Sequence, residues 1–252
     1  MSEQKRETAK VISQEKIAAD IYSMWIGTSI AGTARPGQFI SVYTNDAGKL
    51  LPRPISICEI EKDRLRIVYR IAGAGTREFS GYQAGDDITI LGPLGNGFPT
   101  EDKKAFLIGG GIGVPPMLEL AKQLQCEKKI IVGYRDELFL DQELQQYGSL
   151  YIATEDGSTG TKGNVMDAIR EHALEAEVIY ACGPKPMLRA VKQYASEHHI
   201  KAWISMEERM ACGVGACLGC VCQTKHVDEH SQVHNKRICK DGPVFDAEEV
   251  EL

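Results

Sequence analysis

The sequence has no long apolar run, no excess of basic residues and few aromatic side chains. None of its 252 residues belongs to an apolar stretch approaching the roughly 18 residues of a membrane-spanning helix, so we expect no membrane association. The net charge of −6 excludes a general nucleic-acid-binding protein, which would carry a basic face. Residues 1–16 lack the apolar core of a secretory signal, so we expect a cytoplasmic protein.

A disulfide framework is also not expected, although the chain contains eight cysteines. Four of them fall within residues 210–222, MACGVGACLGCVC. In a reducing compartment, clustered cysteines are more often metal ligands or catalytic groups than disulfide partners. This segment is therefore the first candidate for a functional site.

The first hundred residues predict an antiparallel barrel. Short runs rich in β-branched and aromatic residues alternate with turn formers such as ARPG, NDAG and AGDD. Such spacing is typical of a closed or nearly closed barrel. The predicted strands cover residues 10–14, 20–27, 38–43, 54–60, 64–71 and 86–92.

After residue 100 the pattern changes to alternating strands and helices, which predicts a parallel sheet with helices on both faces. The predicted strands cover residues 103–110, 129–134, 149–154, 177–183 and 201–205, and the predicted helices 115–125, 137–146, 164–173 and 186–198. The chain from about Met206 is cysteine-rich and reads as loop. We therefore predict three segments, 1–100, 101–205 and 206–252.

The cysteine spacing favours an iron–sulfur cluster. Cys212, Cys217 and Cys220 follow C-x4-C-x2-C, and Cys239 comes after eighteen intervening residues, which is the plant-type arrangement for a [2Fe–2S] cluster. A short segment that brings three thiolates together must wrap tightly. Glycine suits such a wrap because it accepts positive φ and lets backbone N–H groups approach sulfur, and the glycines are Gly213, Gly215 and Gly219.

Zinc is the alternative occupant of this segment. A structural zinc site usually has two CxxC pairs, or one with paired histidines, whereas the chain has one CxxC. Three histidines spaced four apart could add ligands, but their segment is polar and reads as an exposed loop; they are His226, His230 and His234. Cys222 is spare under the cluster interpretation.

Two glycine-rich turns predict a nucleotide site. FLIGGGIGVPPMLELAK, residues 106–122, joins a strand to a helix, and its glycines leave space for a phosphate at the helix N-terminus. YACGPKPML, residues 180–188, follows another strand, so both turns lie on the carboxyl edge of the sheet, where ligands bind. No acidic residue stands at the tip of the strand ending at Tyr134, so the ribose rule does not decide between NAD and NADP.

Further motifs carry a family resemblance. RPIS (53–56), VYRIAGAGT (68–76), GPLGNGF (92–98), GGGIGVPP (109–116), TEDGSTGTKG (154–163) and ACGPKPM (181–187) stand in the order of the ferredoxin–NADP reductase superfamily. With MACGVGACLGC and ICKDGPVF near the C-terminus, the chain resembles the electron-transfer subunits of class 1B dihydroorotate dehydrogenases over essentially its whole length.

The resemblance implies a flavin-binding barrel, a nicotinamide-binding α/β domain and an iron–sulfur segment, with FAD, NAD and a [2Fe–2S] cluster as cofactors. The residues that match the flavin-binding segments are Arg53, Pro54, Ile55, Ser56, Val68, Tyr69, Arg70, Gly75 and Thr76. Those that match the nicotinamide loops are Gly111, Gly113, Cys182, Gly183 and Pro184, and the cluster ligands are Cys212, Cys217, Cys220 and Cys239. The superfamily commonly has tyrosine where this chain has Ile55, so aromatic stacking from that position is absent.

The resemblance also implies a route for electrons. An FMN-containing catalytic subunit would oxidise dihydroorotate, and this chain would pass the electrons through the cluster and FAD to NAD+ in pyrimidine biosynthesis, in a heterotetramer with two copies of each subunit. No side chain here would act as a general acid or base. The alternatives are another FAD/[2Fe–2S] NAD(P)H reductase subunit, such as a sulfide dehydrogenase or ferredoxin:NADP transhydrogenase subunit, and a zinc-binding interaction module.

Overall fold

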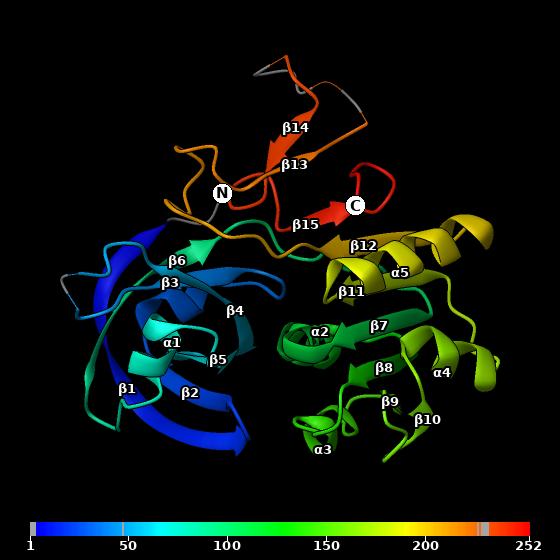
Figure 1. Cartoon of the computed structure of the whole chain (residues 1–252), viewed down its shortest axis with the longest axis horizontal. Helices are drawn as coiled ribbons and strands as arrows, with labels where there is room; N and C mark the ends of the chain where they lie inside the picture. The colour runs from blue at the N-terminus through cyan, green and yellow to red at the C-terminus, as the bar shows by residue number, and fades with distance from the viewer. Residues whose placement is uncertain (1–3, 47, 226, 228–231) are drawn as a thin grey trace.

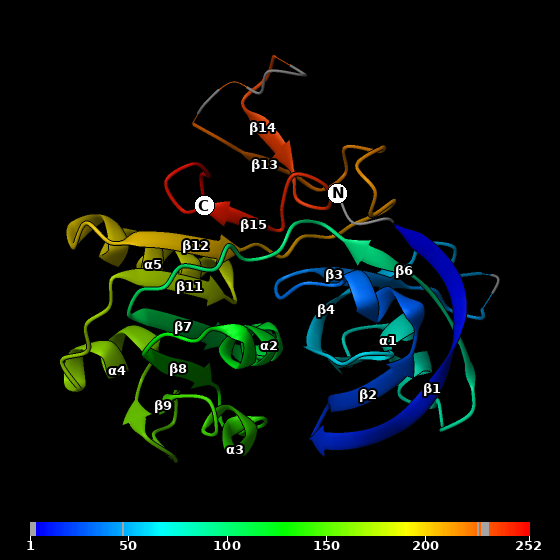
Figure 2. The same ribbon diagram turned by 180° about the vertical axis from the view of Figure 1, so that it is seen from behind.

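The computed structural model describes residues 4–46, 48–225, 227 and 232–252. Figures 1 and 2 show a barrel, a sheet with flanking helices, and a third part that sits across the junction between them. The predicted fold class, a β barrel followed by an α/β domain, is confirmed. No helix in the described part of the chain is long and apolar enough to cross a membrane.

Six antiparallel strands close the barrel in the order β1-β2-β5-β4-β3-β6. Its interior is filled by apolar side chains from alternate strand positions, and residues such as Met24, Ile40 and Ile67 have no exposed surface. The elements are β1 (Lys5–Ala18), β2 (Ile21–Gly27), η1 (Ser29–Thr33), β3 (Phe39–Val42), β4 (Arg53–Ile60), β5 (Arg64–Arg70), α1 (Ala74–Phe79) and β6 (Asp87–Leu94).

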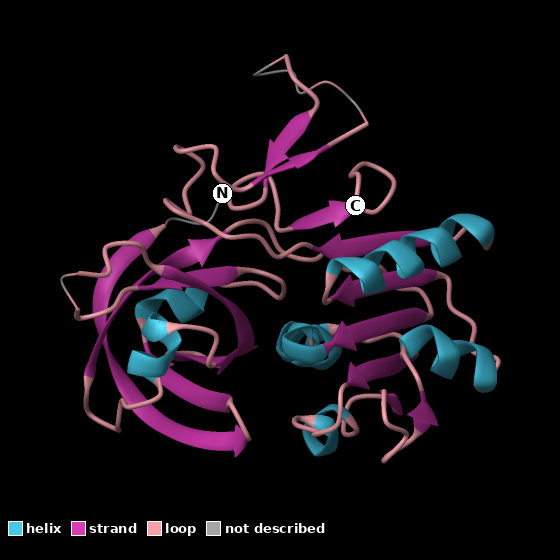
Figure 3. Ribbon diagram, viewed as in Figure 1, coloured by secondary structure: helices cyan, strands magenta, loops and turns pink. Residues whose placement is uncertain are grey.

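The second part is a seven-stranded sheet in the order β10-β9-β8-β7-β11-β12-β15 (Figure 3). Every pairing in it is parallel except that of β12 with β15. The strands are β7 (Ala105–Gly110), β8 (Lys128–Tyr134), β9 (Ser149–Thr154), β10 (Thr161–Lys162), β11 (Val178–Cys182), β12 (Lys201–Ser205) and β15 (Val244–Asp246). The glycine-rich turn contains η2 (Gly111–Gly113), and the helices are α2 (Pro115–Gln123), α3 (Asp141–Leu144), α4 (Val165–Glu171) and α5 (Lys185–Glu197).

Two separate apolar cores cover the faces of this sheet. Helices α4 and α5 pack on one face, and the third part of the chain joins their core through Cys222, Ile238 and Phe245. Helices α2 and α3 pack on the other face, in a core that also contains Cys58 and Val68 of the barrel. The face of the sheet that carries α2 therefore packs against the barrel. The glycine-rich turn, which directly precedes α2, lies on this side of the sheet.

The predicted helix over residues 137–146 is wrong in its first half. Only Asp141–Leu144 is α-helical, and Leu140 has a φ of 62°, which interrupts a right-handed helix. Phe139 is buried, and its carbonyl accepts a hydrogen bond of 2.7 Å from the Tyr134 hydroxyl. This contact holds residues 137–140 as an irregular segment.

The C-terminal part contains more regular structure than its sequence predicts. β13 (Val221–Gln223) and β14 (Asn235–Arg237) form a two-stranded sheet, and β15 extends the large sheet beside β12. These strands are three residues long, too short to show a clear alternation in sequence. The pairing of β15 with β12 fixes the cysteine-rich segment to the α/β domain.

Candidate functional site: a cofactor cleft beside a cysteine loop

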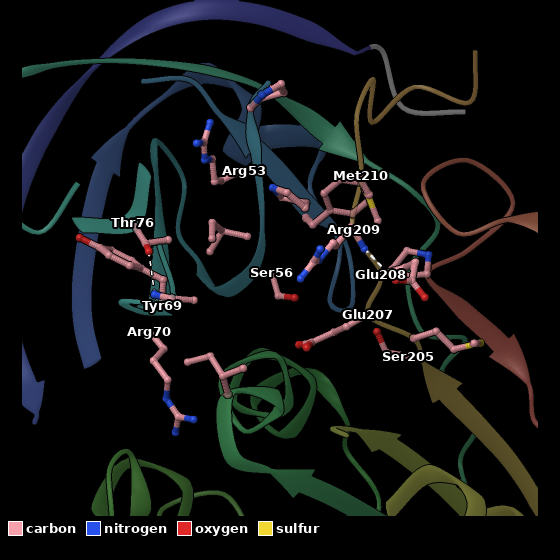
Figure 4. A pocket seen from close by; sticks show the side chains of 18 of the residues that line it. Arg53, Ser56, Tyr69, Arg70, Thr76, Ser205, Glu207, Glu208, Arg209 and Met210 are labelled. Atoms are coloured by element: carbon pink, nitrogen blue, oxygen red, sulfur yellow. Dashed lines mark hydrogen bonds between the residues drawn. The ribbon is translucent and has the colours of Figure 1, made fainter. Parts of the chain in front are cut away.

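A cleft of about 840 Å³ lies where the barrel, the glycine-rich turn and the chain after β12 meet (Figure 4). Cofactor sites in proteins have volumes of roughly 300–1,000 Å³. The residues Ser205–Met210, called the strap below, form one wall of the cleft and run from the end of β12 toward the first clustered cysteine. Of the residues that match flavin-binding segments, Arg53, Pro54, Ile55, Ser56, Val68, Tyr69, Arg70 and Thr76 line the cleft.

Gly75 does not line the cleft, but it makes room for Arg53. A Cβ atom at Gly75 would stand 2.2 Å from the Arg53 Nε and 2.7 Å from its Cζ. The guanidinium therefore lies against the bare backbone of α1, and its Nη1 donates a hydrogen bond to the Leu51 carbonyl oxygen. Arginine suits a diphosphate because its planar fork bonds phosphate oxygens in pairs.

Tyr69 and Thr76 use their hydroxyls within the barrel. The Tyr69 hydroxyl donates to the Gln14 Oε1 at 2.8 Å, and burial raises the pKa of this phenol. The Thr76 Oγ1 accepts hydrogen bonds from the backbone N–H groups of Ala72 and Gly73, at 2.9 and 3.2 Å. Both residues line the cleft, and their hydroxyl groups form hydrogen bonds to other residues of the same domain.

The strap brings charged residues to the cleft that the sequence reasoning missed. Glu207, Glu208 and Arg209 line it, and Figure 4 shows Glu207 and Arg209 on the same side as Ser56. The Glu207 side chain retains exposed surface toward the cleft, yet partial burial raises the pKa of its carboxyl, an effect that Arg70 opposes. The available signal was the run MEERM, residues 206–210, which ends two positions before Cys212.

The two predicted nucleotide turns lie against each other. A Cβ at Gly113 would stand 2.3 Å from the Cys182 carbonyl oxygen, and one at Gly110 would stand 3.1 Å from the Pro184 Cδ. Gly111 has a φ of +54°, with no atom within 4 Å of where its Cβ would be. The turns thus form a close-packed base with open space in front of Gly111, as the approach of a nucleotide requires.

Cys182 ends β11 and is 1% exposed. Burial raises the pKa of its thiol, and the hydroxyl of Ser205 is its hydrogen-bond partner. Ser205 lines the cleft, whereas Cys182 does not. Cys182, which we predicted to lie near the nicotinamide, therefore lies behind Ser205. Gly183 lies next to it, where a Cβ would stand 2.5 Å from the Met187 Cε.

Three of the four predicted cluster ligands lie on one loop, Cys212–Cys220, called the cluster loop below, and Cys239 contacts this loop. Its backbone N–H groups point at sulfur: the Cys212 Sγ accepts from Val214, Ala216 and Cys217 at 3.5, 3.3 and 3.4 Å. Gly215 donates to the Cys239 Sγ at 3.1 Å, Gly219 to the Cys217 Sγ at 3.4 Å, and Cys239 to the Cys220 Sγ at 3.4 Å. Such donors stabilise negative charge on thiolate sulfur.

The loop reaches this shape through three residues with positive φ. Gly213 and Gly215 have φ values of +70° and +84°. The third is Leu218, with a φ of 57°, whereas Gly219 is not in this region. The sequence reasoning identified two of these positions correctly and missed Leu218.

The four sulfur atoms are arranged as two pairs. Besides the effect of burial, Cys217 lowers the pKa of Cys212, and Cys220 raises the pKa of Cys239. Burial tends to raise the pKa of Cys212, but the N–H donors lower it to about 6. Within the described residues, no group of three or more His, Cys, Asp or Glu side chains is already arranged to hold a metal ion.

Cys222 stands apart from these pairs. It lies on β13 with its side chain in the apolar core, and burial raises the pKa of its thiol to about 11. Of the histidines considered as zinc ligands, His226 and His230 lie outside the described residues. Two sulfur pairs with N–H donors fit a binuclear cluster, in which each iron takes two thiolates.

Gly75→Ala should weaken FAD binding. The new methyl group would displace the Arg53 guanidinium, so we expect the dissociation constant for FAD to rise about tenfold or more, which corresponds to about 1.4 kcal/mol. Fluorescence titration of flavin-free protein measures this. Gly73→Ala is the matched control, because no atom lies within 4 Å of its Cβ position, and unchanged affinity in Gly75→Ala would refute this role of the glycine.

Cys222→Ala should keep the cluster, whereas Cys220→Ser should lose it. Alanine suits the apolar surroundings of Cys222, so we expect wild-type iron and acid-labile sulfide in this variant. Cys220→Ser removes a sulfur that accepts a backbone hydrogen bond within the paired set, and iron should fall by more than half. Loss of iron in Cys222→Ala at wild-type folding would show that the ligand set is misassigned.

Comparisons with known proteins agree with this geometry. The family described as "Iron-sulfur cluster binding domain of dihydroorotate dehydrogenase B" matches residues 207–251, and that described as "Oxidoreductase NAD-binding domain" matches residues 107–193. Among solved structures, one of an NADH-dependent reduced ferredoxin-NADP oxidoreductase superposes with a TM-score of 0.87 at 28% identity, covering 97% of this chain and 90% of that one.

Relatives with higher identity share one description, "Dihydroorotate dehydrogenase B (NAD(+)), electron transfer subunit". The protein of Geobacillus sp. (strain WCH70) is 44% identical over 98% of this chain and 99% of its own length. That of Listeria monocytogenes serovar 1/2a is 46% identical over 96% of this chain and 98% of its own length. The cleft, the paired thiols and these identities together place the chain in the family of dihydroorotate dehydrogenase B electron-transfer subunits.

Proposed function

We propose that this chain is the electron-transfer subunit of an NAD-dependent dihydroorotate dehydrogenase and carries electrons from a partner's FMN through [2Fe–2S] and FAD to NAD+. Segment 1–100 binds FAD, segment 101–205 binds NAD and segment 206–252 holds the cluster. When bound, the flavin exchanges hydride with a nicotinamide and single electrons with a cluster, which makes it the intermediate carrier.

The observation that carries this proposal is the strap. Met210 lines the cleft and stands two positions before Cys212, so one short piece of backbone borders both the flavin site and the sulfur pairs. Gly213 also contacts the barrel, where its Cβ would stand 2.9 Å from the Ser41 Oγ. The cluster loop therefore packs on the barrel beside the cleft, as transfer between the two cofactors requires.

The chain's own residues supply binding and positioning. Arg53 pairs with the FAD diphosphate, the N–H groups of the cluster loop hold the thiolates, and Gly111 admits the nucleotide. Ser56, at the cleft surface, offers a hydroxyl to the flavin edge. No general acid or base of this chain takes part, because dihydroorotate is oxidised on the partner.

The exposed face around Cys217 is where the FMN-containing catalytic subunit docks, two copies of each subunit forming a heterotetramer. Cys217 is the exposed member of the ligand set, and three large apolar side chains beside it are also exposed: Val214 by 37%, Leu218 by 61% and Val221 by 38%. Apolar surface of this kind marks protein interfaces. The NAD pool and oxidation-sensitive thiolates support a cytoplasmic location.

The 28% identical NADH-dependent ferredoxin-NADP oxidoreductase favours a second candidate, a transhydrogenase-type subunit with a different partner. The two candidates share the cofactor chain and differ in the electron donor. Formation of NADH from dihydroorotate by this chain with its co-purified partner distinguishes them, because a transhydrogenase subunit would not support it.

Cys217→Ser should separate the two halves of the route. Loss of a cluster ligand should cut dihydroorotate-dependent NADH formation more than about a hundredfold. Reduction of FAD by NADH in the same preparation should stay within about twofold of wild type, because the cleft is untouched. Stopped-flow flavin absorbance and steady-state NADH formation measure the two halves. Retained NADH formation would contradict the route.

Leu218→Asp should weaken docking of the catalytic subunit. Aspartate tolerates the positive φ of this position better than most residues, so the loop should keep its shape while the interface gains a charge. We expect affinity for the catalytic subunit to fall at least about tenfold with unchanged iron and FAD. Ile12→Asp, at a comparably exposed apolar residue on β1, is the control. If both variants bound the catalytic subunit with the same affinity, the face around Cys217 would not be the docking site.

A further inference from the structure

We infer that Arg66 and Glu143 are positioning residues: their ion pair links the flavin barrel to the nicotinamide domain and sets how the glycine-rich turn faces the flavin strand. This inference rests on the proposed function, and it concerns residues that lie outside the cleft. Neither residue belongs to any motif in the sequence.

Arg66 is a charged side chain on a barrel strand, yet it is only 7% exposed. Its Nε donates to the Ser23 Oγ at 2.8 Å, and its Nη1 donates to the Glu59 Oε2 at 2.8 Å; both partners are in the barrel. The same Nη1 bonds the Glu143 Oε2, and Nη2 reaches the Glu143 Oε1 at 3.2 Å. Glu143 is on α3, so the guanidinium joins two domains through a two-pronged contact.

Helix α2 adds two contacts to the same place. The Glu119 side chain is buried, and its Oε2 accepts a hydrogen bond of 2.7 Å from the backbone N–H of Ile60, at the end of β4. Lys122 Nζ lies 3.6 Å from the Glu59 Oε1. Glu59 therefore faces cations from both domains, and the interface is a network of charged groups rather than a plain apolar contact.

Two elements of this network, β4 and α2, also carry or adjoin residues that line the cleft. Ser56 lines the cleft three residues before Glu59 on β4, a span of about 10 Å. Ile112 lines it from the turn that opens α2, and Glu119 lies four residues into that helix from Pro115, about 6 Å. Helix α2 lies between the sheet and the barrel (Figure 1). Rotation of the domains about this contact would therefore change the spacing between flavin and nicotinamide.

A buried guanidinium with two carboxylate partners gives the contact a defined geometry. Burial alone would lower the pKa of Arg66, and the bonds to Glu143 and Glu59 outweigh that effect and raise it. Apolar packing between domains tolerates sliding, whereas a bidentate arginine–carboxylate pair specifies direction as well as distance. Hydride transfer needs such definition, because a displacement of about 1 Å can cost about a hundredfold in rate.

The test compares Glu143→Gln and Arg66→Met with Arg64→Met in the full chain loaded with FAD and cluster. Arg64 lies in the same hairpin, but its ion pair with Glu61, at 2.8 Å, stays within the barrel. Glu143 is 40% exposed, so its variant should fold even if burial of Glu59 harms Arg66→Met. NADH oxidation with ferricyanide as acceptor is measured per bound FAD, together with the long-wavelength absorbance of nicotinamide stacked on flavin.

We expect kcat to fall about tenfold in Glu143→Gln and Arg66→Met, with the KM for NADH within about threefold, FAD affinity unchanged and the stacking absorbance reduced. The double variant should be no slower than Arg66→Met alone. Arg64→Met should match wild type. Unchanged kcat per FAD in Glu143→Gln would overturn the inference while leaving the proposed function intact. A wild-type chain that neither binds FAD nor oxidises NADH would overturn both.

Discussion

The contact between the strap and the cleft is the constraint on which the rest of the structure depends. Ser205–Met210 must end a strand of the large sheet, line the cleft and deliver Cys212 to the cluster loop within a few residues. The pairing of β15 with β12 holds the other end of the cysteine segment, because Cys239 precedes it by only a few positions. Both ends of the segment are thus tied to the sheet that carries the two predicted nucleotide turns.

Positioning by backbone is a recurrent feature of the site. The N–H groups of Val214, Gly215 and Cys217 point at sulfur, and the bare backbones of Gly75 and Gly113 leave room for a guanidinium and for a neighbouring turn. Ionisable side chains, by contrast, bridge two parts of the chain in the pair of Arg66 with Glu143. This division suits a protein whose cofactors carry the chemistry, since the chain has only to fix their separation and surroundings.

The features that could be predicted from the sequence are those encoded by residues close together in the chain. Short β-branched and aromatic runs between turn formers predicted the barrel, and alternating strands and helices predicted the parallel sheet. The C-x4-C-x2-C spacing predicted sulfurs that the structure brings together. Arg53 and Ser56 were found because they belong to a short motif, and both line the cleft. The roles assigned to the individual site residues stay predictions until they are tested by substitution.

What the sequence could not predict depends on contacts between distant residues. Arg66 and Glu143 are 77 positions apart, and a lone charge in a strand pattern resembles a solvent-facing residue. Leu218 adopts a positive φ next to a glycine that does not, the reverse of what the local preferences of the two residues indicate. The first half of the predicted 137–146 helix is absent because Tyr134 bonds the Phe139 carbonyl.

The most direct test of the account is a cofactor inventory of the chain purified without oxygen: iron, acid-labile sulfide, zinc and FAD per polypeptide, with visible circular dichroism of the same sample. Sulfurs arranged in two pairs beside a cleft predict about two irons, about two sulfides and about one FAD, with negligible zinc. A folded, colourless chain that contains stoichiometric zinc and neither sulfide nor flavin would contradict the account.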